Sequence, residues 1–362
     1  MSNDEKVILE GYLGDWAQKS YFRNLAEKAG QSKITFYAVD IRPAPSPVGN
    51  YKKSVIFVDK KSENVKYKAI NDVDYVFIVT PHEFHCLIAE HWLQKGKLSE
   101  NGQIFIEKPL NSSVENILKL EKYKEAKDKI IAIDHYIPKV LPLIEKLEGT
   151  RKKCGKIKKI IFNILESDPI LESRSKTLDE GLILDICPHI LAIFTKIMNI
   201  CNTFQLNADN FEVLTVNTAK YVSAPIAGET FARIVVKIEE VTLECHIGKA
   251  VGTKDNKVLE ILFERGSVTA DFVAGDFSLK IADENPIDGR LQKKHIGTLL
   301  DDIIDKEFNR DEFLKKSLNF DEGFEIVKII TKIRGSMGKP IEYEKSSSLN
   351  KILMKFKALE GL

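Results

Sequence analysis

Three residues of this chain have the types and the spacing to transfer a proton and to stabilise a developing negative charge. Lys108 follows the apolar run 104–106, which has the composition of a strand buried on both faces. Asp185 and His189 lie four positions apart in an apolar stretch, so a helix would present them on one face. Histidine, with a reference pKa of about 6.5, suits a general base, and a lysine can stabilise charge on a reacting oxygen. Such a set would serve chemistry at a hydroxyl or carbonyl carbon.

Each of these residues also has an ordinary structural explanation. Lys108 can be a solvated lysine at a strand end, and His189 can be a core histidine beside a capping aspartate. Residue type alone leaves both explanations open, so the elements that would position the three side chains carry the argument.

The first part of the chain alternates apolar strands with helices. This alternation predicts an α/β fold in which residues 1–145 form a Rossmann domain with a doubly wound parallel sheet. In such sheets ligands bind at the carboxyl ends of the strands, which is where Lys108 stands. The expected strands are 7–9, 34–39, 75–79, 104–106 and 130–133, and the expected helices are 17–29, 84–93 and 114–126.

After about residue 150, strand-like runs follow one another without helices between them. Such runs favour a mostly antiparallel open sheet, so residues 146–362 are expected to form an α+β domain for substrate binding and oligomerisation. Its final helices are candidates to pack back on the first domain. The expected strands are 157–164, 211–216, 231–238, 242–247 and 258–263, and the expected helices are 181–197, 298–304 and 320–333.

The first strand runs into a turn with two glycines, residues 11–17, and then into a helix. Glycines allow a tight turn and the close approach of a pyrophosphate to backbone N–H groups at a helix N-terminus. This arrangement indicates a dinucleotide site. The residues expected to contact the dinucleotide here are Gly11, Leu13, Gly14, Asp15 and Trp16.

Asp40 ends the second expected strand, where an acid can accept hydrogen bonds from the ribose hydroxyls and would repel a 2′-phosphate. The expected cofactor is therefore NAD. Arg42, two positions further on, could accommodate that phosphate, so NADP is the alternative. Pro43, Pro45 and Pro47 follow, and they predict a loop.

Three further motifs, in this order and spacing, resemble the glucose–fructose oxidoreductase/inositol dehydrogenase family (Gfo/Idh/MocA). They are Val79-Thr80-Pro81-His82-Glu83-Phe84-His85, Glu107-Lys108-Pro109 and Gly181-Leu182-Ile183-Leu184-Asp185-Ile186-Cys187-Pro188-His189. The resemblance implies that Thr80, Pro81, Glu107 and Lys108 lie against the cofactor. His85 is expected to pack near the nicotinamide, or else to cap the helix that follows it. The resemblance also implies that Lys108, Asp185 and His189 are catalytic and contact the substrate. Pro188 departs from the family pattern and would be tolerated in the first turn of a helix.

Other segments resemble glucose-6-phosphate dehydrogenase. The turn 11–17 looks like that enzyme's opening turn, Ile133-Asp134-His135-Tyr136-Ile137-Pro138-Lys139 looks like its substrate-phosphate signature, and residues 298–302 look like a late helix. The resemblance implies that His135, Tyr136 and Lys139 bind a sugar phosphate. Polar groups at an ordinary strand end are the alternative. Lys249 could add a further positive charge from the second domain.

Composition excludes several other classes of protein. The net charge of +1 gives no field for nucleic acid or membrane binding, and no apolar run approaches the ~18 residues of a spanning helix. Five scattered cysteines predict reduced thiols and a cytoplasmic location. The histidines at 82, 85 and 91 lack the acids or thiols that would complete a metal site, so no metal is expected.

Together these features predict an NAD(P)-dependent dehydrogenase of a sugar or a sugar phosphate resembling glucose 6-phosphate. The alternatives are a reductase of an imine or enone on the same fold and a non-catalytic dinucleotide sensor. An exposed sheet face, with Val235, Ile261 and Phe263 as candidates, would suit a homodimer or homotetramer.

Overall fold

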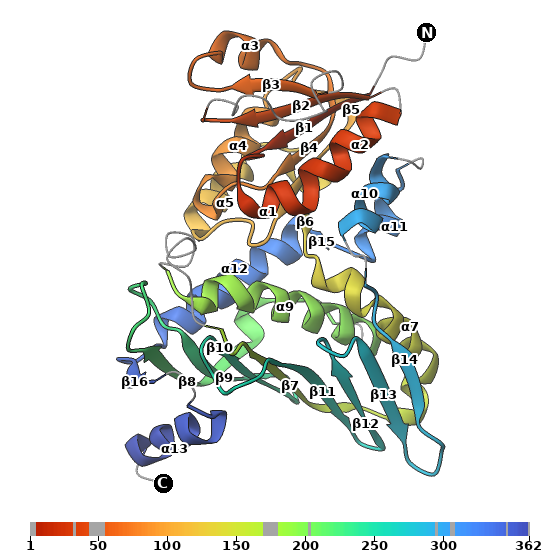
Figure 1. The fold of residues 1–362 in the computed structure, drawn as a ribbon. Helices are drawn as coiled ribbons and strands as arrows, with labels where there is room; N and C mark the ends of the chain where they lie inside the picture. The colour runs from red at the N-terminus through yellow and green to blue at the C-terminus, as the bar shows by residue number, and fades with distance from the viewer. Residues whose placement is uncertain are drawn as a thin grey trace. The chain divides into compact units, whose positions relative to one another are not determined.

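The computed structural model describes residues 5–31, 34–42, 55–168, 180–201, 204–293, 296–304, 308–344 and 347–360. The proline-rich segment 43–47 therefore lies outside the described residues. The chain divides into two compact units, each with its own sheet (Figure 1). The first unit is Met1–Pro138 with Lys294–Val327, and the second is Lys139–Lys293 with Lys328–Leu362.

The first unit contains a seven-stranded sheet in the order β15-β6-β5-β4-β1-β2-β3. Its neighbouring strands are parallel except where β15 pairs antiparallel with β6. The doubly wound parallel sheet predicted for the start of the chain is confirmed. The strands are β1 (Glu5–Glu10), β2 (Ile34–Asp40), β3 (Val55–Asp59), β4 (Val73–Ile78), β5 (Leu98–Glu107), β6 (Ile130–Ile133) and β15 (Leu318–Asn319).

The strand order reverses at β1, which lies between β2 and β4. Ligands of open α/β sheets bind at such a reversal, beyond the carboxyl ends of the strands. The helix expected at 17–29 is divided into α1, a π-helical turn η1 (Gln18–Phe22) and α2. The helices of this unit are α1 (Asp15–Ala17), α2 (Arg23–Gln31), α3 (Asn64–Ala69), the short 3-10 helix η3 (His82–Phe84), α4 (His85–Trp92), α5 (Val114–Leu120), α6 (Ala126–Lys129), α10 (Ile296–Ile304) and α11 (Arg310–Leu314).

Residues 294–327 belong to the first unit, although they follow the strands of the second unit in the sequence. The reason is the apolar face of α10, where Leu299, Leu300 and Ile303 are buried in one core cluster with strand residues such as Phe77 and Phe105. The expected boundary at 145 also falls inside a helix, α7 (Tyr136–Cys154), and α12 (Phe320–Gly335) likewise runs from one unit into the other.

The second unit contains a nine-stranded sheet in the order β14-β13-β12-β11-β7-β10-β9-β8-β16. Only β7–β10 and β8–β16 pair parallel, so the predicted α+β unit with a mostly antiparallel sheet is confirmed. Its strands are β7 (Ile157–Leu165), β8 (Phe211–Tyr221), β9 (Phe231–Ile238), β10 (Val241–Gly248), β11 (Asn256–Phe263), β12 (Gly266–Asp271), β13 (Asp276–Ile281), β14 (Ile287–Arg290) and β16 (Ile341–Tyr343). Its helices are α9 (Leu182–Cys201), the 3-10 helix η4 (Ala208–Asn210) and α13 (Leu349–Glu360).

The register of this sheet separates the three residues expected on one oligomer face. Val235 pairs with Glu244, whose neighbours across the next strands are Ile161 and Glu260, so Val235 shares a face with polar residues. Ile261 and Phe263 point to the opposite face and are 0% and 6% exposed. The three residues therefore do not form one surface, because neighbouring positions along a strand alternate between faces.

Helix α9 packs against β7, β9 and β10 (Figure 1). By length and composition its residues Leu182–Ile200 could cross a membrane, although polar residues interrupt the apolar run. However, 72% of that stretch is buried within the structure, and a core helix of a globular unit has the same composition. We therefore interpret α9 as the core helix of the second unit.

Candidate active site

The glycine turn lies directly against the end of β4. Gly11 has a φ of 81°, and a Cβ there would stand 2.7 Å from Thr80 Cγ2 and 3.0 Å from the Val79 carbonyl oxygen. The Gly11 N–H donates to the Val39 carbonyl at 2.8 Å. Only glycine satisfies both the left-handed backbone and this close approach.

The helix after the turn begins without a side-chain cap. The N-cap residue is Gly14, whose N–H donates to the Gly11 carbonyl at 3.0 Å, and Asp15 and Trp16 beyond it are exposed. Thr80 Oγ1, on the neighbouring strand end, is buried without a hydrogen-bond partner among the described residues. A cradle that a Cβ would fill and an unsatisfied hydroxyl beside it both fit a dinucleotide at this place.

Asp40 joins the turn to the end of β2. It is 5% exposed, and its Oδ2 accepts a hydrogen bond from the Leu13 N–H at 3.2 Å. Arg42 donates two hydrogen bonds to the same carboxylate, from Nε to Oδ1 at 3.1 Å and from Nη2 to Oδ2 at 3.3 Å. This contact raises the pKa of the guanidinium. The predicted ribose acceptor and the predicted phosphate ligand are therefore paired with each other.

Glu107 anchors the end of β5 to the helix that follows the glycine turn. It is 6% exposed, and its Oε1 accepts hydrogen bonds from Tyr21 Oη at 2.6 Å and from Trp16 Nε1 at 3.1 Å. Burial and the neighbouring Glu107 raise the pKa of Tyr21 well above its ordinary value. Lys108 is partly exposed, its N–H donates to the Ile133 carbonyl at 3.2 Å, and its bond to Pro109 is cis.

His135 lies beside the same tryptophan. Its ring centroid is 5.0 Å from that of Trp16 and 4.7 Å from that of Tyr136. Tyr136 is the first residue of α7, where its N–H donates to Asp134 Oδ1 at 2.7 Å. The structure therefore brings Trp16, Glu107 and His135 together within the first unit.

His85 connects the ends of β4 and β5. Its ring is 1% exposed, with Nδ1 2.9 Å from the Pro109 carbonyl oxygen and Nε2 2.8 Å from the Thr80 carbonyl oxygen. Burial lowers the pKa of His85 to about 4. Pro81, between these contacts, accepts a hydrogen bond from the Phe84 N–H at 3.0 Å through its carbonyl oxygen.

A buried charge that the sequence did not single out lies at the end of β1. Glu10 is 1% exposed, and its carboxylate accepts hydrogen bonds from Tyr67 Oη at 2.8 Å and Trp92 Nε1 at 3.0 Å. Lys60 Nζ lies 2.9 Å from its other oxygen. The sequence signal that could have found it is a carboxylate between the apolar run 7–9 and Gly11.

Asp185 and His189 both lie on α9 in the second unit. Asp185 is in the first turn and partly exposed, and His189 is 9% exposed. Because α9 begins at Leu182, Pro188 lies inside the helix and not in its first turn, so the position at which the proline would be tolerated is not the one it occupies. Proline has no N–H to donate to the carbonyl oxygen four residues earlier, yet the helix continues to Cys201.

The start of α9 is held by a residue from a distant loop. Glu229 is 4% exposed, its Oε1 accepts a hydrogen bond from the Ile183 N–H at 2.8 Å, and its carbonyl oxygen accepts one from the Leu182 N–H at 3.2 Å. Burial raises the pKa of Glu229, while the bonds from backbone N–H groups oppose that rise. Gly181 leaves room for this cap, because a Cβ there would be 2.1 Å from Glu229 Oε2.

Three lysines come together at one end of the second unit's sheet. Lys249 and Lys257 both pair with Glu166, the second at 2.6 Å. Burial and the charge of Lys257 lower the pKa of Lys249 to about 8 and also lower that of Lys139. Lys139 Nζ donates to the Phe272 carbonyl at 3.0 Å. Lys139 thus belongs to the second unit, whereas His135 and Tyr136 belong to the first.

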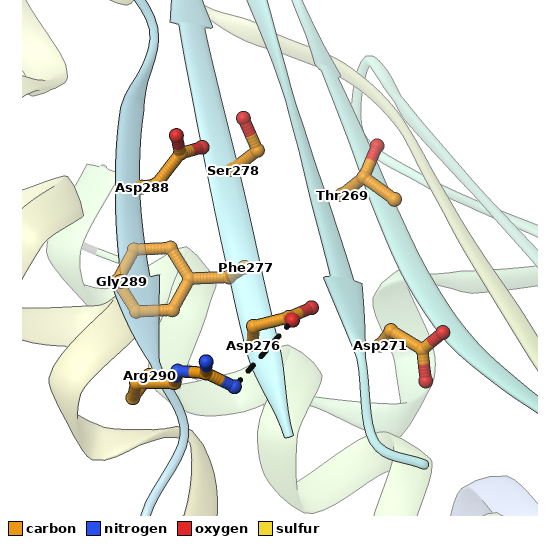
Figure 2. A pocket seen from close by; sticks show the side chains of 8 residues that line it. All are labelled: Thr269, Asp271, Asp276, Phe277, Ser278, Asp288, Gly289 and Arg290. Carbon is orange, nitrogen blue, oxygen red and sulfur yellow. Dashed lines mark ion pairs between the residues drawn. The ribbon is translucent and has the colours of Figure 1, made fainter. Parts of the chain in front are cut away.

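An open concavity of about 590 Å³ lies on β12, β13 and β14 (Figure 2). Asp276 and Arg290 pair across it at 3.7 Å, and Asp271 and Asp288 add two further carboxylates. None of the predicted site residues lines it. Within the described part of the chain, no group of three or more histidine, cysteine or acidic side chains is arranged to hold a metal ion.

The glycine turn, its acid and the strand order define the first unit as a dinucleotide-binding Rossmann domain. Residues 19–135 match the oxidoreductase family with an NAD-binding Rossmann fold, Gfo/Idh/MocA. The match covers this segment of the first unit, and it agrees with the family that the motifs at 79–85 and 107–109 resemble. No curated protein matches the chain by sequence.

Solved structures share the fold over almost the whole chain at low identity. A UDP-N-acetylglucosamine 3-dehydrogenase from Acidithiobacillus ferrooxidans is 16% identical, with a TM-score of 0.63, covering 92% of this chain and 97% of that one. A glucose-6-phosphate 1-dehydrogenase from Mycobacterium avium is 16% identical, with a TM-score of 0.70, covering 95% and 94%. A 3-ketoreductase from Actinomadura kijaniata, in complex with NADP, is 12% identical, with a TM-score of 0.67, covering 94% and 100%.

Proposed function

We propose that this protein is an NAD(P)-dependent dehydrogenase that transfers a hydride between the nicotinamide and a hydroxyl or carbonyl carbon of a sugar or sugar phosphate. One observation carries the proposal. Through Trp16 and Tyr21, the helix that follows the dinucleotide turn is hydrogen-bonded to Glu107, the residue before Lys108. A cofactor bound at the turn would therefore lie close to a lysine that can polarise a carbinol oxygen.

Each proposed catalytic residue has a separate task. Lys108 donates a hydrogen bond to the reacting oxygen and stabilises its negative charge. His189 exchanges the hydroxyl proton, and Asp185 orients the imidazole or binds a neighbouring hydroxyl. The cofactor, when bound, accepts or supplies the hydride.

An anionic substrate is supported by the lysines of the second unit. Lys139, Lys249 and Lys257 bring three positive charges near Glu166, Asp255 and Asp271, and the two lowered lysine pKa values are expected where like charges are crowded and partly desolvated. A bound phosphate would replace Glu166 as the partner of Lys249 and Lys257. His135 and Tyr136 are proposed to contact the same class of substrate with ring and hydroxyl donors. The structural relatives named above, which include a dehydrogenase of glucose 6-phosphate, lend support to a sugar phosphate.

The cofactor preference depends on Asp40. In the proposed complex with NAD, Asp40 exchanges its contact with Arg42 for the ribose hydroxyls. Arg42, whose side chain is 58% exposed, would be free to meet the 2′-phosphate of NADP. We propose NAD as the main cofactor and NADP as the second.

We also propose a cellular location and an oligomeric state. Cys86, Cys154, Cys187 and Cys245 are buried and free, which suits a reducing cytoplasm. We propose a homodimer or homotetramer with neither a nucleic-acid nor a membrane partner.

The test is reduction of NAD and NADP, followed by absorbance, with a panel of sugars, sugar phosphates and polyols. Wild type is compared with Lys108→Ala and with Lys122→Ala, which removes an exposed lysine of the same unit. Loss of turnover only in Lys108→Ala supports the assignment, and equal activity in all three proteins refutes it. A preference for glucose 6-phosphate over glucose that disappears in Lys249→Ala supports the phosphate site.

A further inference from the structure

The segments that follow β4 and β5 are joined by side chains from both. Asn111, which is 0% exposed, donates through Nδ2 to the His82 carbonyl at 3.0 Å, and its Oδ1 accepts from the Ser113 N–H at 2.9 Å. His85 contacts the residue immediately after Lys108, because its Nδ1 lies 2.9 Å from the carbonyl oxygen of Pro109. The segment carrying Lys108 is thus held from the side of α4.

The ring of His85 lies near two hydrogen-bond acceptors, but a neutral imidazole can donate to only one. Both nitrogens lie within hydrogen-bond distance of a carbonyl oxygen, and a neutral ring carries a single N–H. Burial opposes a second proton, since it lowers the pKa of this histidine to about 4. At neutral pH, therefore, the ring of His85 donates a hydrogen bond to only one of the two carbonyls.

Burial decides which carbonyl that is. The contact between Nδ1 and the Pro109 carbonyl is buried, whereas the contact between Nε2 and the Thr80 carbonyl is only partly buried. A buried acceptor left unpaired costs about 1–3 kcal/mol, and a solvated one costs much less. The tautomer with the proton on Nδ1 is accordingly favoured.

We propose that His85 is a positioning residue for Lys108, acting through a hydrogen bond from its Nδ1–H to the Pro109 carbonyl. The inference rests on the proposed role of Lys108 and adds the group that fixes the backbone immediately after it. Hydride transfer is sensitive to position, because a displacement of about 1 Å can cost roughly a hundredfold in rate.

Two substitutions separate the two nitrogens. The amide nitrogen of asparagine lies as far from Cβ as Nδ1 does, and that of glutamine lies as far as Nε2. His85→Asn therefore keeps a donor toward Pro109, and His85→Gln keeps one toward Thr80. The matched control is His91→Gln, on the same helix, where the ring stacks on Tyr67 at 4.6 Å and burial also lowers the pKa to about 4.

The first readout is steady-state kinetics. We expect kcat to fall at least about tenfold further in His85→Gln than in His85→Asn, with the KM for the dinucleotide nearly unchanged in both. His91→Gln should keep the wild-type kcat. Equal losses in the two His85 variants, or a larger loss in His85→Asn, would overturn the proposal.

The second readout needs no activity. Hydrogen exchange of the peptide spanning 107–113 should accelerate in His85→Gln and stay slow in His85→Asn and His91→Gln. If the wild type oxidises none of the sugars but the exchange pattern appears, the proposed function fails while the positioning contact stands. If hydrogen exchange of this peptide in His85→Gln is as slow as in the wild type, the hydrogen bond from His85 does not hold the segment, whatever the activity.

Discussion

The carboxylate of Glu10 makes a strong prediction about stability. Within the described part of the chain its cationic partner is Lys60, whose Nζ lies 2.9 Å from the carboxylate, and the side chains of Lys60 and Glu10 are 18% and 1% exposed. Substituting Lys60→Met keeps the length and the apolar stem of the side chain, which also packs over the Tyr67 ring with Nζ 4.4 Å from its centroid. It removes only the charge, and leaves the buried carboxylate with two neutral donors.

The expected loss follows from that environment. Removing one partner of a buried ion pair destabilises a protein by about 3–5 kcal/mol, because the remaining charge stays desolvated. Tyr67 and Trp92 continue to donate to Glu10, and Lys60 is not fully buried, so we expect the lower end, about 3 kcal/mol. The control is Lys66→Met, which breaks the pair with Glu63 where the lysine is 72% exposed and should cost less than about 1 kcal/mol.

Urea unfolding followed by tryptophan fluorescence measures this difference. The chain has two tryptophans, Trp16 and Trp92, and both belong to the first unit, so the signal reports the unit that contains Glu10. A shifted midpoint at constant slope gives the change in free energy of unfolding. If the losses in free energy of unfolding of Lys60→Met and Lys66→Met agree within about 1 kcal/mol, the buried Glu10 carboxylate does not need the charge of Lys60 and the reasoning is refuted.

Three further predictions follow from the site and its supports. Gly181→Ala should destabilise the second unit by more than about 2 kcal/mol, because φ is 94° and the new Cβ would meet the Glu229 carboxylate. The control Gly149→Ala lies within α7 with nothing near its Cβ, so it should stabilise the unit by about 0.5–1 kcal/mol, and thermal unfolding by circular dichroism compares the two variants. Burial lowers the pKa of His91 from 6.5 to about 4, so as the pH falls the unfolded chain takes up a proton before the folded chain does, and the free energy of unfolding decreases between pH 6.5 and pH 4. In urea titrations over that range this decrease should be smaller in His91→Gln than in the wild type, and an equal decrease would contradict the lowered pKa. Asp40→Ala should raise the ratio of NADPH affinity to NADH affinity by about tenfold, and Arg42→Ala should lower it, when both affinities are measured by fluorescence titration. An equal ratio in the wild type and both variants would show that neither residue selects the cofactor.

Much of the fold follows from local patterns. Apolar runs and the residues that end them located every strand from β1 to β11 apart from β3, although β5 begins earlier than expected, at Leu98. They also located helices α2, α4, α5, α9, α10 and α12, although α5 ends earlier than expected, at Leu120. Helix α7 was missed although Ile137, Val140, Ile144 and Leu147 recur at helical spacing, because Pro138 and Pro142 interrupt the pattern. The short edge strands β14, β15 and β16 have too few residues to show any period.

The sequence by itself determined the class of the first unit and the candidates for its chemistry. The glycine turn, Asp40 and the lysine after a buried strand are local features, and their meaning depends on neighbours along the chain. Such features carry through to the fold because turn geometry and strand periodicity are properties of short segments.

Tertiary structure alone decided which groups meet. Glu10 finds Tyr67 and Trp92 from positions 57 and 82 residues away, and His85 finds the carbonyl of Pro109, 24 residues away. Sheet register also placed Ile261 and Val235 on opposite faces. Contacts of this kind depend on strand order and register across the whole sheet, because a shift of one residue would exchange the two faces of a strand.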